Sequence, residues 1–171
     1  MRRFRVLAVT ALLLPMAWLS ASPAHAQGGA VCTFAANFRV LPGWSQAPSR
    51  GTLSTGGETG TVACVGVILG QEVLGAGTFG FQGEYGTGPT GGDTCSGGEG
   101  RGLYTMHIPT SLGVIHVQGS FSEDFVGNAG QFFGSGPAEL ICLFQFRPTE
   151  GDCVTTPARA ETLTGQGSVV A

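Results

Sequence analysis

Apolar side chains recur at every second position along several segments of this chain. Over residues 31–40 the even positions are apolar or small, and the same period of two appears over residues 73–85 and 138–147. Such a period places alternate side chains on opposite faces of a β-strand, and no segment beyond residue 26 has a helical period. The pattern therefore predicts half-buried strands, with further strands expected at residues 60–69, 102–108, 114–121, 131–134 and 162–170.

Glycine is the second feature that limits the fold. The chain contains 30 glycines and nine prolines, and most of them fall after residue 26. This content alone is compatible with disorder, but the large apolar side chains are too many and the charges too few for a disordered chain. Glycines also share one face of segment 73–85 with Phe79, Phe81 and Tyr85, as expected where strands coil sharply in small barrels.

Short strands separated by turns rich in Gly, Pro, Ser and Thr are typical of all-β domains. We predict a single antiparallel β-barrel of about 8–10 short strands, with a β-sandwich as the alternative. The longest turns are expected at residues 43–50, 86–102 and 148–159.

The first 26 residues have the organisation of a secretory signal peptide. Three arginines within the first five residues precede an apolar run over residues 6–19, and the small-x-small motif Ala24-His25-Ala26 follows. We expect cleavage between Ala26 and Gln27, which leaves residues 27–171 as one glycine-rich domain that is secreted into the extracellular space. No later apolar stretch is long enough to cross a bilayer, so the sequence predicts no membrane span.

The sequence contains no lysine. This excludes Schiff-base lysines, the phosphate-binding lysine of a P-loop and the Ser-x-x-Lys arrangement of some acyl-transfer enzymes. After residue 26, five arginines stand against eleven Asp and Glu residues, which gives a net charge of −6 without a basic cluster. Binding to nucleic acid and to anionic membranes is therefore disfavoured.

Five cysteines follow the expected cleavage site, and none forms a Cys-x-x-Cys pair. In an exported protein this spacing favours structural disulfides over a zinc site or a redox pair. Proximity in the sequence suggests that Cys32 pairs with Cys64 and Cys142 with Cys153, which leaves Cys95 unpaired in a glycine-rich loop. A free Cys95 would serve as a nucleophile or an intermolecular bridge. In the alternative, Cys95 is bridged and another cysteine is buried unpaired.

His107 and His116 flank residues 109–113, a segment with the composition of a hairpin turn. If the hairpin is centred between Ser111 and Leu112, the two imidazoles lie opposite one another and can share a ligand. Two imidazoles and a carboxylate are able to hold a transition metal, but no third ligand stands at an identifiable spacing. The alternative is a pair of strand histidines that face solvent, so the sequence predicts neither a metal site nor another cofactor.

Glu123 and Asp124 are adjacent carboxylates of the kind used in acid–base chemistry. Neighbouring residues on a strand point to opposite faces, so the two would diverge in an extended segment, and a solvated turn is the expected place for both. Trp44, in the turn-rich segment 41–45, is a candidate for ligand binding if it is exposed. If it is buried, we expect it to pack over one end of the barrel.

Two short segments accompany the export signal, Gly92-Asp93-Thr94-Cys95-Ser96-Gly97-Gly98 and Gly151-Asp152-Cys153-Val154-Thr155-Thr156-Pro157. Together these features resemble small secreted glycine-rich β-proteins of high-GC bacteria whose activities are not characterised. The resemblance covers the mature chain loosely and implies no activity or catalytic residue.

The sequence favours a non-enzymatic binding or structural protein of the cell envelope or the medium, whose partner is a protein, a glycan or a small molecule. The first alternative is a small barrel enzyme, a lyase, isomerase or hydrolase, that uses His107, His116 and a carboxylate in the lumen. The second alternative is a secreted inhibitor that presents a disulfide-braced loop.

Overall fold

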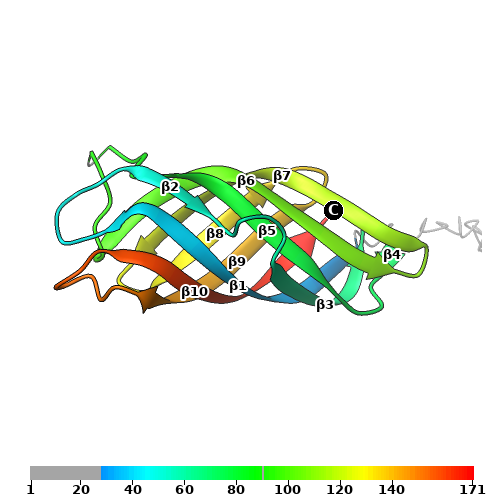
Figure 1. The fold of residues 1–171 in the computed structure, drawn as a ribbon. Helices are drawn as coiled ribbons and strands as arrows, with labels where there is room; N and C mark the ends of the chain where they lie inside the picture. Colours follow the sequence, from blue (N-terminus) through cyan, green and yellow to red (C-terminus); the bar gives the residue numbers. More distant parts are fainter. Residues whose placement is uncertain (1–27, 90) are drawn as a thin grey trace, which may run out of the picture.

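A computed structural model describes residues 28–171 apart from residue 90. Ten strands and no helix occupy this part of the chain, so the all-β prediction is confirmed (Figure 1). In chain order the strands are β1 (Gly29–Trp44), β2 (Gly51–Ser54), β3 (Gly60–Ile68), β4 (Gln71–Glu72), β5 (Ala76–Tyr85), β6 (Gly97–Thr110), β7 (Gly113–Val126), β8 (Ala129–Ser135), β9 (Glu139–Glu150) and β10 (Ala158–Val170).

The strands form one antiparallel sheet that closes on itself (Figure 1). Each strand from β5 to β9 pairs with the next along the chain, and β10 returns to pair with β1. On its other side β1 pairs with both β2 and β3, and β5 also pairs with both of these strands. β2 and β3 thus act as one interrupted strand, and the result is a barrel-like ring of hydrogen-bonded strands.

Side chains at alternate positions fill the inside of the ring, and aromatic residues are prominent among them. Phe121 and Phe132 stack with their ring centroids 4.6 Å apart, and Phe34, Phe79 and Phe81 continue the same cluster. An internal cavity among the apolar side chains has a volume of about 10 Å³, which is near the lower limit for a single water molecule. The ring therefore encloses a packed core.

Inward-facing glycines make room for the largest of these rings. A Cβ atom on Gly119 or Gly134 would lie 2.8 or 2.7 Å from the Tyr104 ring, closer than real side chains approach. Tyr104 is fully buried, and its hydroxyl donates a hydrogen bond to the carbonyl oxygen of Ala138 at 3.1 Å. The predicted sharing of one face by glycines and aromatic residues is also found in β5, where the buried aromatic residues are Phe79, Phe81 and Tyr85.

Some strand boundaries differ from those that the sequence predicts. β6 begins at Gly97 and β9 ends at Glu150, inside segments whose glycine and proline content predicts turns. Both strands are paired on each side, and this pairing outweighs the local preference for a turn. The sequence does not predict β2 and β4, because strands of four and two residues are too short to show a period.

All five cysteines lie in the described part of the chain, and they form two disulfides. Cys32 pairs with Cys64, its register partner across β1 and β3, as predicted. The second bridge joins Cys95 to Cys153, so the predicted Cys142–Cys153 bridge and the free Cys95 are both wrong. Cys142 stays unpaired because it faces the core from β9, whereas Cys95 and Cys153 lie in loops with their Cα atoms 6.1 Å apart.

These pairings confirm the alternative in which Cys95 is bridged and another cysteine is buried. Burial raises the pKa of the Cys142 thiol to about 12, so this thiol is a poor nucleophile at neutral pH. Two disulfides in a chain of this size indicate an oxidising compartment.

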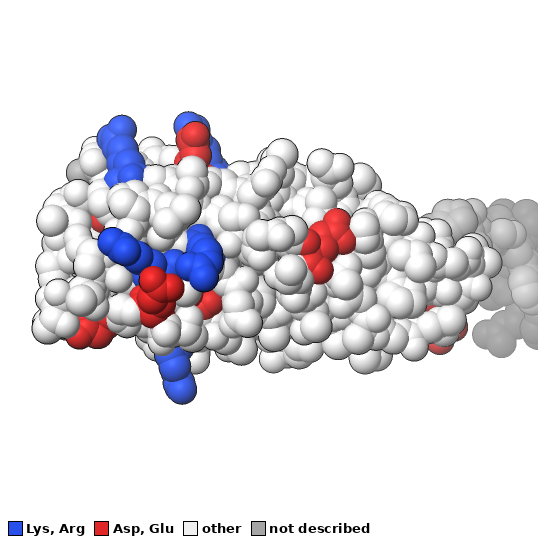
Figure 2. Space-filling model, viewed as in Figure 1, with Lys and Arg blue, Asp and Glu red and all other residues white. Residues whose placement is uncertain are grey.

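One end of the ring is covered by loops, and we call it the loop end. Trp44 packs there against Phe125 and Phe146, with ring centroids 4.9 and 5.2 Å apart. The Cys95–Cys153 bridge ties the β5–β6 loop to the β9–β10 loop over the same end. On the face shown in Figure 2, the basic side chains gather toward the loop end, which lies at the left of the view.

No helix in the described residues is long and apolar enough to cross a membrane. The predicted signal peptide and its cleavage site lie outside the residues that the structure describes.

Candidate binding site on the outer wall

The two histidines lie on the outside of the ring. His107 and His116 are register partners across β6 and β7, as the hairpin predicts, and their ring centroids are 4.0 Å apart. Met106 and Ile108, which flank His107, are fully buried inside, and 38% of the His107 side chain is exposed. The alternative that places the histidines in the lumen is therefore wrong, because the inward positions of these strands belong to the residues on either side.

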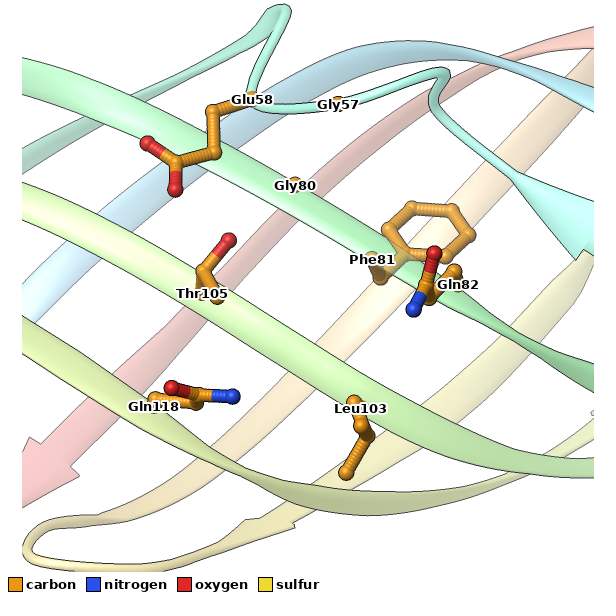
Figure 3. A pocket seen from close by; sticks show the side chains of 8 residues that line it. All are labelled: Gly57, Glu58, Gly80, Phe81, Gln82, Leu103, Thr105 and Gln118. Carbon is orange, nitrogen blue, oxygen red and sulfur yellow. The ribbon is translucent and has the colours of Figure 1, made fainter.

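A short loop, residues 55–59, interrupts the wall between β2 and β3. Thr55 fixes the start of this loop, because its hydroxyl accepts a hydrogen bond from the Phe81 N–H at 3.1 Å and its own N–H donates to the Phe81 carbonyl at 3.0 Å. The Thr59 hydroxyl in turn donates to the Thr55 carbonyl at 2.9 Å. These bonds replace the strand ladder where β2 ends, and residues 56–58 turn outward over β5 (Figure 3).

Glycines allow this loop to lie close to the sheet. Gly56 and Gly57 have φ angles of 73° and 110°, in the left-handed region that glycine adopts without strain. Gly80 lies beneath the loop, and a Cβ atom at that position would collide with the Gly57 carbonyl oxygen. A side chain on residue 80 would therefore push the loop away from β5.

The loop brings Glu58 to the histidines. Glu58 Oε2 lies 2.6 Å from His107 Nδ1, and it accepts a hydrogen bond from Thr78 Oγ1 at 3.2 Å. This contact uses the Nδ1 side of the His107 ring and leaves Nε2 outside it. Glu58 thus constrains the orientation of the His107 ring on the outer wall.

The outer wall is hollowed next to this cluster, over β5, β6 and β7 (Figure 3). The hollow has a volume of about 360 Å³ and is lined by Gly57, Glu58, Gly80, Phe81, Gln82, Leu103, Thr105 and Gln118. Thr105 and Gln118 are register partners, two residues along their strands from His107 and His116. The hollow, His107 and His116 therefore form one continuous surface, which we call the outer-wall site.

The outer-wall site is nearly neutral. Glu58 is the one charged residue among those that line the hollow. No three His, Cys, Asp or Glu side chains within residues 28–89 and 91–171 are placed to hold a metal ion. The hollow thus offers amide, hydroxyl and carboxylate groups for hydrogen bonds to a ligand.

Glu123 and Asp124 do not form a carboxylate pair. Both lie on β7, where Glu123 faces inward and Asp124 outward, so the divergence expected for an extended segment is found. The predicted solvated turn is wrong, because β7 continues to Val126 and is paired on both sides. Burial raises the pKa of Glu123 to about 8, and the charges of Asp93 and Asp124 act in the same direction.

Trp44 and Glu161 are also buried. Trp44 is 2% exposed, so it belongs to the core at the loop end, as the packing alternative expects, and offers no surface to a ligand. Glu161 is 1% exposed, and burial raises its pKa to about 7. The two carboxylate oxygens of Glu161 have no hydrogen-bond partner among the described residues, and neither has Trp44 Nε1.

Sequence reasoning finds the histidine pair but misses Thr55, Glu58 and Gly80. The segment Thr55-Gly56-Gly57-Glu58-Thr59 has the composition of a turn that breaks a strand. The two successive glycines before Glu58 are the only sign in this segment of a loop that carries a carboxylate. The contact between Glu58 and His107 joins residues 49 positions apart, and no period in the sequence encodes it.

No protein-family model matches this chain, and no curated protein or solved structure matches it either. The function must therefore be inferred from the site.

Proposed function

We propose that this protein is a non-enzymatic binding protein that works outside the cytoplasm and takes its ligand at the outer-wall site. One observation carries this proposal: the inside of the ring is packed with side chains, while the wall is opened by the loop at residues 55–59. The hollow on the wall therefore offers room for a small ligand, whereas the cavity found among the core side chains does not.

The chemistry of the hollow favours a small, uncharged, hydroxyl-rich ligand such as a mono- or disaccharide. Gln82, Gln118 and Thr105 supply neutral donors and acceptors, and Glu58 supplies a strong acceptor for hydroxyl groups. The exposed side chain of Leu103 adds an apolar surface for the carbon face of such a ligand. The hollow has no arginine in its lining, and a site without a cation is poorly suited to phosphate, sulfate or carboxylate ligands.

The proposal includes export. Residues 1–26 would direct the chain to the secretory route, and cleavage between Ala26 and Gln27 would release the β-domain into a compartment where both disulfides form.

The test is a titration of isotopically labelled exported protein with a panel of neutral mono- and disaccharides, followed by amide and side-chain NMR shifts. We expect at least one saccharide to shift the side-chain amides of Gln82 and Gln118. The Gln118→Leu variant should weaken that binding at least about tenfold. The matched control is Gln166→Leu, an exposed glutamine on β10, which should bind as the original protein does.

Binding that persists unchanged in Gln118→Leu, or that moves only signals of other faces, would remove the outer-wall site from the proposal. Binding of anionic sugars alone would contradict the ligand class.

A second candidate, a protease inhibitor, is supported by the loop over residues 151–157. Cys153 anchors this loop, and Asp152 Oδ1 accepts hydrogen bonds from the N–H groups of Val154, Thr155 and Thr156. Val154, within this loop, is 77% exposed. Inhibition of a member of a protease panel, lost in Val154→Asp and retained in Val126→Asp, would favour this function over saccharide binding.

A further inference from the structure

His107 and His116 have the arrangement of two ligands of a metal site. They are register partners on neighbouring strands, and their rings already lie 4.0 Å apart on the outer face. After the expected cleavage they are also the only two histidines in the chain. Any imidazole-dependent property of the exported protein therefore comes from this pair.

Glu58 provides the support that a metal-binding histidine requires. Such a histidine donates its second ring N–H to a carboxylate or carbonyl, which fixes the ring and makes the coordinating nitrogen more basic. Glu58 is the carboxylate placed for this role, because its Oε2 lies 2.6 Å from His107 Nδ1. The Thr78 hydroxyl donates a hydrogen bond to the same carboxylate at 3.2 Å. The arrangement leaves His107 Nε2 free to coordinate.

The rings need only a small movement to share an ion. With metal–nitrogen distances of about 2.0–2.1 Å, two coordinating imidazoles at a tetrahedral angle have centroids about 5 Å apart. We expect rotation of the exposed His116 side chain to bring the 4.0 Å separation to that value, while His107 stays against Glu58 and the strands keep their places. The negative charge of Glu58 beside the pair also favours a cation.

We propose that His107 and His116 together bind one divalent transition-metal ion of the class that prefers imidazole, Cu²⁺ or Zn²⁺, with Glu58 as the carboxylate behind His107. The protein supplies two ligands, and the remaining coordination positions face solvent and the hollow. This inference does not depend on saccharide binding, and it requires no change in the packing of the core. Copper should bind more tightly than zinc, and Mg²⁺ should not bind here, because imidazole is a poor ligand for hard cations.

The test uses exported protein without a histidine tag, titrated with ZnCl₂, CuCl₂ and MgCl₂ by calorimetry, together with imidazole ¹⁵N NMR during the zinc titration. We expect one Zn²⁺ per chain and coupled shifts of both histidines in the unmutated protein. His107→Asn and His116→Asn should each lower zinc affinity at least about tenfold, and Glu58→Gln by about 10–100-fold. The matched control is Glu72→Gln, an exposed carboxylate on β4, which should leave the affinity unchanged.

Because the NMR titration uses the unmutated chain, the result does not rest on whether every variant folds. Zinc that shifts neither histidine, or only one of them, overturns the shared site. Zinc affinity that is equal in both histidine variants and the original protein overturns it as well. An unchanged affinity in Glu58→Gln overturns the role of that carboxylate.

Discussion

The inside and the outside of the ring are built from the same strands, yet they have opposite character. Along β6 the inward residues Tyr104, Met106 and Ile108 are fully buried, while Thr105 and His107 point outward between them. Inside, aromatic rings stack and leave a cavity of about 10 Å³. Outside, the wall carries amides, hydroxyls, histidines and a hollow of about 360 Å³.

This difference shows how a filled ring of strands can still present a site. A break in one strand lets a loop rise from the wall and form one side of a hollow. Residues 55–59 provide that break, and the core beneath continues without interruption because Thr55 replaces the missing ladder bonds to Phe81. Stability and chemistry are therefore assigned to opposite faces of the same strands.

The largest effect is expected from a change inside the ring. Phe132→Ala removes a ring that stacks on Phe121 at 4.6 Å and is 4% exposed, and should lower the free energy of unfolding by about 3–5 kcal/mol. Phe133→Ala is the matched control, because the next residue faces outward and is 40% exposed. Its cost should be about 1 kcal/mol or less. Chemical denaturation with the disulfides intact measures both, and equal losses would contradict the division between the two faces.

A smaller effect is expected from the buried carboxyls. The native pKa values of Glu123 and Glu161 are raised by burial to about 8 and about 7, from 4.5 without the fold. Between these pKa values the two carboxyls keep their protons in the native chain and lose them in the unfolded chain. The contribution of the two neutral carboxyls to the stability of the native chain is therefore complete below pH 4.5 and is lost as the pH rises to about 8. We expect the free energy of unfolding to be lower at pH 8 than at pH 5 by on the order of a few kcal/mol.

Denaturant titrations from pH 5 to pH 8 measure the slope of the free energy of unfolding against pH. Glu123→Gln keeps the shape of the side chain without its titration and should flatten the slope, whereas Glu139→Gln, an exposed carboxylate on β9, should keep it. A slope of the opposite sign, with stability rising over this range, would show that Glu123 does not face the core.

The sequence predicts the inner face better than the outer one, for a physical reason. The core selects apolar residues at every second position, so the strands containing Phe38, Phe81 and Phe144 are visible as a period. The sequence also predicts that His107 and His116 meet, because a hairpin fixes the register of its two strands. Glu58 and the Cys95–Cys153 bridge depend on which loops the closed ring brings together, and sequence proximity favours the wrong partner for Cys153.

The smallest effect on stability is expected at Gly80, and it should change the site alone. Gly80→Ala places a methyl group against the Gly57 carbonyl and should move the loop at a cost of about 1 kcal/mol. The contact between Glu58 and His107 should weaken, and the imidazole signals of His107 should shift in the NMR spectrum. Gly75→Ala is the control, because its added Cβ meets nothing within 4 Å. Identical histidine spectra in the two variants would show that the loop does not depend on Gly80.

The most direct measurement is solvent paramagnetic relaxation enhancement by an inert, soluble gadolinium complex, recorded at side chains on both faces of the ring. A filled ring with its site on the wall predicts strong enhancement at His107, His116 and Gln118, and little at the rings of Phe79 and Phe132. Enhancement at those two phenylalanines as strong as at the histidines would mean that solvent enters the ring, and would contradict the filled interior on which the outer-wall site depends.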